Sequence, residues 1–587
     1  MLFGLMVISP LNAYELPISM GEIPVGGNMK RVQNRLLLVA VIAALMAGCD
    51  SGGINIEPTT VDNSTNTGGG TNTPVTSYDG PCAYYEQGDG TIVHGDYNES
   101  KGNCEYQRDF VDAGNPLMHD ITLATLADGG AHVFIGSLVI GQNYDSHADM
   151  QAAGITQGGD GAKLTIEPGV TVAFNSAAES LVINRGSQIF AVGTSSAPIT
   201  VTSLSDVNGE ISDPEAVGEW GGMVVNGFGV TNKCEYTGSV DDGDLAMADG
   251  ECNVDVEGLI GDAVSNYGGE NNADNSGKLS YFRVKHTGFD VVPGNELNGI
   301  TFGAVGSGTV LENIQAYSTQ DDGVEFFGGA VNMTNYVAMF VNDDSIDIDE
   351  GYRGTITNSL VIQGQSEGAN CIESDGIGSY SSKDDDTIQD FIARGLNSRP
   401  TIDGLTCIIS PVDGSDDPGA GWRFREAIFP TVINSMVVAT FIAADTKSLN
   451  DNYCLRIDNE ETLQGAEDGD IVLESNIFVC EEKTNGDALP GGQTIQAWAV
   501  ANENIFADVT GAVDPTTNAS TDLQVLQGAT LPIFSVNISD MVVNDVPITI
   551  TPKGNRAYLG ALSESEANLD WTRGWAVGLD KNLWIAN

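Results

Sequence analysis

The stretch from Leu311 to Ile362, LENIQAYSTQDDGVEFFGGAVNMTNYVAMFVNDDSIDIDEGYRGTITNSLVI, decides the fold because it repeats itself. Asn313, Asn335 and Asn358 lie 22 and 23 residues apart, and a strand-like apolar run follows each of them. Gly and polar turn residues separate these runs, and no helical period lies between them. The chain is therefore expected to stack repeated units rather than to fold around one globular core.

A period of 22 or 23 residues suits one coil of a parallel β-helix, whose coils stack at about 4.8 Å. Asn side chains at equivalent points can hydrogen-bond along a ladder in the turn, which predicts a structural role for them. TVINSMVVA (431–439) echoes TITNSLVIQ (355–363), so Asn434 is expected in the same role. Residues 367–428 break the register, and two polar stretches there are expected as exposed loops, SSKDDDTIQD (381–390) and PVDGSDDPGAGW (411–422).

The first coils resemble a known architecture. LTIEPGVTVAF, SLVINRGSQIFAVG and APITVTS, between Leu164 and Ser203, are short alternating runs separated by Gly, Pro and Asn, and EWGGMVVNG follows around Trp220. This order resembles the opening of pectin-lyase-like β-helix proteins, and the resemblance covers most of residues 130–510. It implies an all-β chain folded as a right-handed parallel β-helix, a solenoid with loop insertions. It is specific for architecture and implies little about activity.

The ends of such a solenoid need covers, because an open coil exposes unpaired strand edges. Residues 131–510 are expected to form the β-helix, 81–130 an N-terminal cap and 511–587 a C-terminal cap region. Three tryptophans near the C-terminus are interpreted as packed cap aromatics, with a sugar-stacking surface as the alternative. They are Trp571, Trp575 and Trp584.

Acidic residues fall into columns when the coils are superposed. The repeat places DDGVEFF (321–327) on DDSIDID (343–349). Strand alternation sends the apolar residues of these runs one way and Glu325 and Asp347 the other. With a three-residue insertion, Glu373 joins the same outward column. The candidate metal ligands are Asp321, Asp322, Glu325, Asp343, Asp344, Asp347 and Asp349.

Such a column creates an electrostatic problem. Carboxylates within about 5 Å on adjacent strands repel one another unless they are protonated or bridged. A hard divalent cation with about 6–8 oxygen ligands removes the repulsion, and Ca²⁺ is the expected ion outside the cell. The alternative is a solvated acidic face without metal. A second acidic group, Asp241, Asp242 and Asp244, lacks the full EF-hand spacing.

The charge balance excludes several partners. The chain has 587 residues, with 81 acidic and 24 basic side chains and a formal net charge of −57. Nucleic acids and anionic membrane surfaces both need basic patches, so neither is an expected partner. No P-loop or dinucleotide fingerprint occurs, so no nucleotide is expected.

One segment resembles the polygalacturonase family of glycoside hydrolases, which are also right-handed β-helices. In that family an Asn-Thr-Asp triplet precedes a strand, and an Asp-Asp pair leads into a Cys-Ile strand one coil later. Here Asn342-Asp343-Asp344 matches the first part, which implies Asp344 as a catalytic carboxylate. The second part fails, because Ala369-Asn370 stand before Cys371-Ile372. The later His-Gly and Arg-Ile-Lys motifs are also missing.

Polysaccharide lyases of the same fold use Ca²⁺ to neutralise a uronate and a Lys or Arg as the base. The one dense basic strand is YFRVKH, in which Arg283 and Lys285 share a face beside His286. A Lys with a shifted pKa can act as a base. The alternative for this strand, as for Arg423 and Arg425, is pairing with surrounding acids.

The cysteines indicate an oxidising compartment. Removing one cysteine for lipidation leaves eight, which allow 105 connectivities. Short separation favours pairing of sequence neighbours, as staples on loops that leave the helix, and the spacings do not suit zinc. The expected pairs are Cys82 with Cys104, Cys234 with Cys252, Cys371 with Cys407, and Cys454 with Cys480.

The N-terminal region predicts export. Residues 1–48 are interpreted as a signal region with the true start at Met29, since a positive segment there precedes a run of twelve apolar residues. Ala47-Gly48-Cys49 resembles a bacterial lipobox, which implies lipidation of Cys49. Asp50 resembles an inner-membrane retention signal of enteric bacteria. We expect an anchored lipoprotein of the outer membrane or cell surface, or of the periplasmic face of the inner membrane, with 49–80 as anchor and flexible tether.

Two functions follow from these observations. The first is a non-catalytic, Ca²⁺-stabilised surface protein that binds a glycan or another surface. The alternative is a polysaccharide-degrading enzyme, a lyase or a glycoside hydrolase, that acts on an extracellular uronan. Its candidate residues are Asp344, Lys285 and Arg283.

Overall fold

The chain is described from a computed structural model. The described residues are 77–507 apart from 260, 293–294, 365–367, 410–418, 439–451 and 481, then 513–514, 519–520, 542–543, 546–547, 550–562 and 571–579. The signal region, Cys49 and Trp584 therefore lie outside the described residues. Among those described, no helix combines the length and the apolar character that a membrane span requires.

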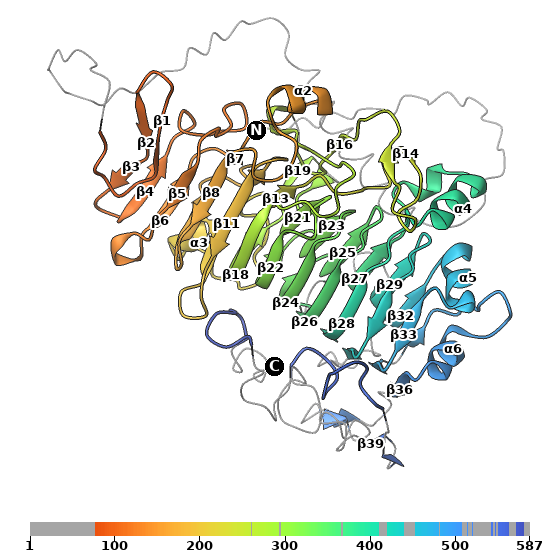
Figure 1. The fold of residues 1–587 in the computed structure, drawn as a ribbon. Coiled ribbons are helices and arrows are strands. Elements are labelled where there is room, and N and C mark those ends of the chain that lie inside the picture. Colours follow the sequence, from red (N-terminus) through yellow and green to blue (C-terminus); the bar gives the residue numbers. More distant parts are fainter. Residues whose placement is uncertain are drawn as a thin grey trace, which may run out of the picture. The chain divides into compact units, whose positions relative to one another are not determined.

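Two parallel sheets form the solenoid, and their strands lie side by side from orange to blue in Figure 1. The first, called sheet 1, has ten strands. They are β7 (Leu138–Ile140), β10 (Leu181–Ile183), β13 (Met223–Asn226), β21 (Ile300–Gly303), β23 (Val324–Phe327), β25 (Ile346–Asp349), β27 (Asn370–Asp375), β29 (Ala420–Arg425), β32 (Tyr453–Ile457) and β35 (Glu482–Thr484).

The second, called sheet 2, has 18 strands in the described part of the chain, with one antiparallel pair at its N-terminal end, and it supplies the other walls of each coil. They are β3 (Asp96–Asn98), β4 (Asn103–Tyr106), β5 (Ile121–Leu123), β6 (Ala131–Phe134), β8 (Lys163–Ile166), β9 (Thr171–Phe174), β11 (Gln188–Val192), β12 (Ile199–Ser203), β18 (Gly277–Thr287), β22 (Val310–Thr319), β24 (Asn332–Val341), β26 (Thr355–Ile362), β28 (Thr401–Ile408), β30 (Thr431–Ile433), β31 (Met436–Val438), β33 (Val472–Glu474), β34 (Ile477–Val479) and β36 (Ile505–Ala507).

The predicted asparagine ladder makes the bend within sheet 2. Asn313, Asn335, Asn358 and Asn434 all have positive φ angles, between 57° and 62°, a conformation that Asn tolerates better than most residues. The Asn335 amide donates to Asn313 Oδ1 at 3.0 Å, and the Asn358 amide donates to Asn335 Oδ1 at 3.1 Å. The ladder and its period are confirmed.

In one coil, a glycine stands at the position of the ladder asparagine, and an arginine side chain lies against it. Gly404 of β28 takes the ladder position with a φ of 80°, and a Cβ there would lie 2.2 Å from a guanidinium nitrogen of Arg556. Arg556 instead donates to Asn358 Oδ1 at 2.8 Å. A residue from the C-terminal region thus completes the ladder.

The core is a continuous apolar interior whose rings stack along the axis. Tyr106, Phe134 and Phe174 have successive ring centroids 4.6 and 6.1 Å apart, and Trp220 follows at 4.9 Å. Stacking of like side chains in successive coils is the packing expected when each coil contacts only its neighbours. The fold is a right-handed parallel β-helix, as predicted.

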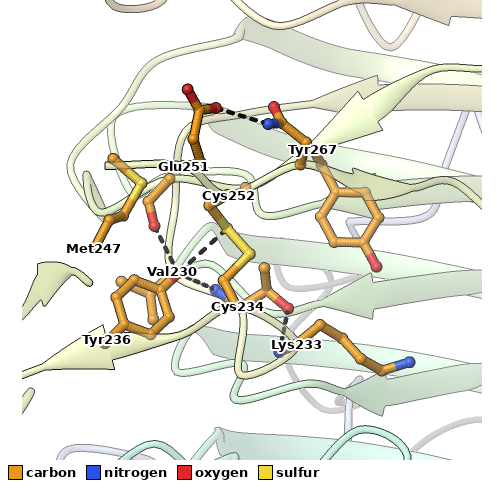
Figure 2. The surroundings of a disulfide bond; sticks show 12 residues. Val230, Lys233, Cys234, Tyr236, Met247, Glu251, Cys252 and Tyr267 are labelled. Carbon is orange, nitrogen blue, oxygen red and sulfur yellow. Dashed lines mark hydrogen bonds between the residues drawn. A yellow bond between two sulfur atoms is a disulfide. The ribbon is translucent and has the colours of Figure 1, made fainter. Parts of the chain in front are cut away.

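An insertion between β13 and β18 lies against the outer face of sheet 1. It carries two hairpins, β14 (Tyr236–Thr237) with β15 (Ala246–Met247) and β16 (Val254–Asp255) with β17 (Asn266–Tyr267). Figure 2 shows the Cys234–Cys252 disulfide inside this insertion, with Tyr236 beside it. Val256, Leu259 and Tyr267 of the insertion join one apolar cluster with residues of sheet 1 such as Phe327.

Residues 367–428 hold both insertions and regular strands. β27 continues the stack after the expected three-residue insertion. β28 and β29 also continue it, so the expected break of register is wrong for these two strands. The prediction of an exposed loop at 381–390 is also wrong in part, because α4 (Asp385–Ala393) forms there with Asp384 as its N-cap. The Asp384 carboxylate accepts from Thr387 N–H and satisfies a helix-terminal donor.

The other α-helices among the described residues are short. They are α2 (His147–Ala152), α3 (Leu204–Val207), α5 (Glu460–Asp468) and α6 (Ile495–Ala501). α5 and α6 place Ala466, Ile495 and Trp498 in the core cluster of the last coils.

Four disulfides form, and they join the pairs that short separation favours. The prediction that all four staple loops is wrong for two of them. Cys371 of β27 and Cys407 of β28 are fully buried in the core, and so are Cys454 of β32 and Cys480 after β34. Both bonds cross the interior between sheet 1 and sheet 2, where all four cysteines belong to the core cluster.

The described part of the C-terminal region packs along the side of the solenoid. Trp575 is 1% exposed and joins a cluster with outward residues of sheet 2, among them Tyr317, Met339 and Leu360. Trp571 stacks on Trp575 with ring centroids 6.3 Å apart. Trp575 is therefore packed against protein, as the first interpretation of the aromatic cluster expected.

Candidate metal centre

Three groups of carboxylates meet on the outer face of sheet 1. Within each group, one ligand oxygen per residue lies within 4.8 Å of the others, so each group can hold a metal ion. The groups are Asp321 with Asp322 and Asp343, Asp322 with Glu325 and Asp347, and Asp344 with Asp347 and Glu373. Six of the seven sequence-derived candidates belong to them, together with Glu373.

Strand register builds the column as the repeat predicted. Glu325 of β23 pairs with Asp347 of β25, and Asp347 pairs with Glu373 of β27. Thr301 of β21 precedes them, and Arg423 of β29 follows. The column therefore reads Thr, Glu, Asp, Glu, Arg in successive coils.

A second ladder lies beside this column, in the turn that enters sheet 1. Asp322 N–H donates to Asn298 Oδ1 at 3.2 Å, and Asp344 N–H donates to Asp322 Oδ1 at 3.0 Å. Asn370 N–H donates to Asp344 Oδ1 at 2.6 Å, and Ala420 N–H donates to Asn370 Oδ1 at 2.7 Å. The same structural position is thus Asn, Asp, Asp and Asn in four coils.

The two asparagines donate hydrogen bonds from their side-chain amides to residues of the column. Asn298 Nδ2 donates to Thr301 Oγ1 at 3.1 Å and to Glu325 Oε2 at 2.5 Å, and Asn370 Nδ2 donates to Glu373 Oε1 at 3.3 Å. In the two middle coils, an aspartate carboxylate replaces that amide and faces other carboxylates. A donor is missing there, and a proton or a cation is needed in its place.

Burial of these carboxylates strengthens the need for a proton or a cation between them. Asp322, Glu325 and Asp344 are 5–7% exposed. Desolvation first, and neighbouring carboxylates second, raise the pKa of each of these three groups well above its ordinary value in the metal-free protein. The pKa of Asp347 is raised for the same two reasons. Removing solvent from a charged carboxylate is costly unless an opposite charge compensates it.

Two arginines supply opposite charge at the end of the column that Glu373 occupies. Arg423 lies 2.7 Å from Glu373 and 3.2 Å from Asp458, and Arg425 contacts both Glu373 and Asp375 at 2.5 Å. The carboxylates around them raise the pKa of both guanidiniums, despite an opposing effect of burial. Both arginines stay protonated and act as fixed positive charges.

The insertion borders the column beside Glu350, which directly follows β25. Tyr267 donates to Glu350 Oε2 at 2.8 Å, and Lys233 lies 3.2 Å from Glu350 Oε1. Glu257 of the same insertion is one of the charges that raise the pKa of Glu325. The insertion thus adds negative charge to the column at Glu257 and positive charge at Lys233.

Two sequence-derived candidates lie elsewhere. Asp349 is outside the three groups, and burial first, then the charges of Glu350 and Asp375, raise its pKa well above its ordinary value. In the second acidic group, Asp241 pairs with Arg353 at 2.9 Å. Asp244 accepts a hydrogen bond from Ser239 N–H.

The residues of the enzymatic alternative lie on different walls of the solenoid. Asp344 lies in the turn before β25 of sheet 1, where its carboxylate caps Asn370 N–H. Lys285 lies on β18 of sheet 2 and pairs with Asp206 at 2.6 Å. Arg283 of the same strand donates to Thr200 Oγ1 and to the Trp575 carbonyl.

Sequence reasoning missed Asn298 and Asn370 as members of the second ladder. A signal for them existed, because both stand three residues before a column residue, as Asp322 and Asp344 do. It also left Arg423 out of the column, although its register follows from that of Glu373 once β29 is recognised as the next strand.

A family model described as a pectate-lyase-like beta helix domain matches residues 142–512, which is more than half of the chain. Nothing among curated proteins or solved structures matches the chain. The matched range begins near β7 of sheet 1 and includes every residue of the three carboxylate groups. The chain belongs to the family of pectate-lyase-like β-helix domains.

Proposed function

We propose that this protein is an exported, lipid-anchored β-helix protein of the cell surface, which binds Ca²⁺ in its acidic column and holds a glycan or another surface without cleaving it. The exchange of Asn for Asp in the second ladder carries the metal part. Asn298 and Asn370 donate amide hydrogens to the column, whereas Asp322 and Asp344 stand at the same position and donate none when ionised. A bound cation supplies what the amides supply in the neighbouring coils.

The donor set favours Ca²⁺ among biological cations. All ligand atoms in the three groups are carboxylate oxygens, which hard cations prefer. Ca²⁺ accepts about 6–8 oxygens in flexible geometry, whereas Mg²⁺ requires a near-ideal octahedron. Groups that share Asp322 and Asp347 along one column suit the more flexible ion.

The paired arginines support a non-catalytic role. A lyase needs a base, and Arg423 and Arg425 remain protonated among the acids that they contact. Lys285, the other candidate base, lies on sheet 2, away from the acidic column, and pairs with Asp206 of α3. The lyase stays the second candidate because cationic side chains do adjoin the carboxylate column and the family is pectate-lyase-like.

Calcium binding is tested by calorimetric titration of Ca²⁺ into EDTA-treated protein, with Mg²⁺ as the competing ion. Asp347 belongs to two of the three groups, so Asp347→Asn is expected to weaken binding more than tenfold. Asp242→Asn removes an exposed carboxylate outside the groups and serves as the control. The same heat of binding for the wild type, Asp347→Asn and Asp242→Asn would overturn the proposal.

Cleavage is tested with a panel of uronans, scored for unsaturated and reducing ends with and without Ca²⁺. We expect no product. Product that Asp344→Asn or Lys285→Ala abolishes would establish the enzymatic alternative instead. A glycan array run with the same protein identifies the ligand of the non-catalytic role.

Anchoring depends on Cys49. Replacing it by Ser is expected to release the protein from the membrane fraction of the producing cells and to prevent incorporation of a labelled fatty acid. Membrane retention and labelling of the Cys49→Ser protein would contradict the anchor.

A further inference from the structure

A cavity of about 300 Å³ lies on the outer face of sheet 2, away from the acidic column of sheet 1. Its floor consists of two neighbouring columns, in each of which threonine is followed by a basic residue. Thr171 of β9, Thr200 of β12 and Arg283 of β18 form one column in register. Thr202 and Lys285 belong to the next column, two residues along the same strands.

The walls come from two other parts of the chain. Asp206 of α3 and Val577 of the C-terminal region both line the cavity. Val577 is held in place by a reciprocal pair of hydrogen bonds, since Gln315 Nε2 donates to its carbonyl at 2.8 Å and Gln315 Oε1 accepts from its N–H at 2.9 Å. A pocket with one wall on a helix and one on a docked segment is a defined concave site.

Arg283 has no carboxylate partner at ion-pair distance among the residues that the structure describes. Its Nε and Nη2 donate to Thr200 Oγ1 at 3.1 and 2.7 Å, and Nη1 donates to the Trp575 carbonyl at 3.0 Å. A guanidinium has five N–H donors, so these three bonds leave two for another acceptor. In a chain of net charge −57, a half-buried arginine bound only to neutral oxygens is unusual.

The local charge count leaves one positive charge. Lys285 and Asp206 neutralise each other at 2.6 Å, and Thr202 also donates to Asp206 at 2.8 Å. Burial lowers the pKa of His286, the next titratable neighbour of Asp206, so this ring is neutral. Burial lowers the pKa of Arg283, and Asp206 is the neighbouring charge that opposes this effect. Asp213 and Glu215 act, together with Asp206, on Tyr317 of β22. Arg283 is therefore the uncompensated charge of the cavity.

We infer that this cavity binds a small hydroxylated carboxylate, free or as the terminal unit of a glycan, with the carboxylate on Arg283 and the hydroxyls on the threonines and Asp206. The guanidinium fork matches a carboxylate geometrically. The volume equals that of about ten waters, which suits a ligand of one sugar-acid unit. The inference deepens the proposed glycan binding and is separate from the metal centre.

The test is calorimetric titration of the whole protein with glucuronate and with a glucuronate-terminated oligosaccharide. Glucose, acetate and sulfate are the comparison ligands. We expect glucuronate to bind at millimolar concentration, more tightly than the three comparison ligands, and EDTA to leave its affinity unchanged. Tighter binding of the oligosaccharide would assign the site to a glycan terminus, and equal affinity would assign it to the free sugar acid.

Variants then locate the site. Arg283→Gln removes the fork, and Thr171→Leu fills the floor without removing any hydrogen bond of Arg283. Each is expected to weaken glucuronate binding by at least about tenfold. Lys278→Gln, on the same strand but in a surface pair with Glu312, is the control and should bind as the wild type does.

Three results would overturn the inference. They are no glucuronate binding by the wild-type protein at millimolar concentration, binding that both variants retain, and equal affinity for glucuronate and any of the three comparison ligands. Because the calcium titration uses other residues and another sheet, a failure here leaves its outcome unchanged.

Discussion

Replacing Asp322 and Asp344 together by Asn should stabilise the protein in EDTA and destabilise it relative to wild type in Ca²⁺. The double variant gives the two middle coils the amide that Asn298 and Asn370 give to the outer coils. Both substitutions keep the Oδ1 atom that caps the backbone of the next coil. Only the charge and one donor change.

The magnitude follows from the spacing of the carboxylates. Two charged carboxylates at 4.8 Å, the outer limit of separation within a group, repel by about 3.5 kcal/mol at an effective dielectric constant of about 20. Protonation relieves part of this repulsion in the metal-free protein, and each new amide hydrogen bond contributes about 1 kcal/mol. We expect the double variant to be about 2–4 kcal/mol more stable than wild type in EDTA.

In Ca²⁺ we expect the order of stability to reverse, so that the wild type is more stable than the double variant. Each ion bound at a hundred times its dissociation constant stabilises the wild-type protein by about 2.7 kcal/mol, and the variant loses ligands of all three groups. Thermal unfolding in EDTA and in a Ca²⁺ series measures both effects. The control, Asp242→Asn with Asp249→Asn, removes two exposed charges outside the groups and should follow the wild type. A double variant that is less stable than wild type in EDTA, or that gains as much from Ca²⁺, would refute the reasoning.

Further predictions concern pH, the ladder and the disulfides. The raised pKa of Asp322, Asp344 and Asp347 means that the metal-free folded protein retains protons that the unfolded chain releases above about pH 4. Melting temperature in EDTA should therefore fall as pH rises from about 4 through these raised pKa values, and saturating Ca²⁺ should flatten the slope; a stability that rises with pH in EDTA would count against this. Asn335→Ala removes two ladder hydrogen bonds and places Ala at a φ of 62°, so it should lower the free energy of unfolding, measured with denaturant, by about 2–4 kcal/mol. Asn335→Gly removes the same hydrogen bonds but tolerates this φ, so it should lower the free energy of unfolding by less. Equal losses for the two variants would mean that backbone strain at this position is irrelevant. Replacing Cys371 and Cys407 by Ser should lower stability by about 2–5 kcal/mol, and an unchanged melting temperature would contradict a structural role for this core disulfide.

Periodicity alone predicted a large part of the fold. Asn313, Asn335 and Asn358 define the bend of sheet 2, and their spacing also set the register that places Glu325 beside Asp347. These features follow from sequence because a repeat fixes every position of a coil once one position is known.

The environment of the column could not be predicted in the same way. Burial of Glu325 depends on an insertion whose packing against sheet 1 has no periodic signal. The core position of Cys371 could not be predicted either, because strand alternation places it on the same face as the outward Glu373, two residues later. The cavity beside Arg283 needs Val577, nearly 300 positions later in the chain, and no local pattern joins the two.

The most direct test of the metal centre is a crystal structure of the protein grown with Ca²⁺, with the ions located by anomalous scattering. We predict peaks between Asp322, Glu325 and Asp347 and between Asp344, Asp347 and Glu373, with oxygens at about 2.3–2.6 Å. Carboxylates that share protons at hydrogen-bond distance, with no anomalous peak at saturating Ca²⁺, would contradict it.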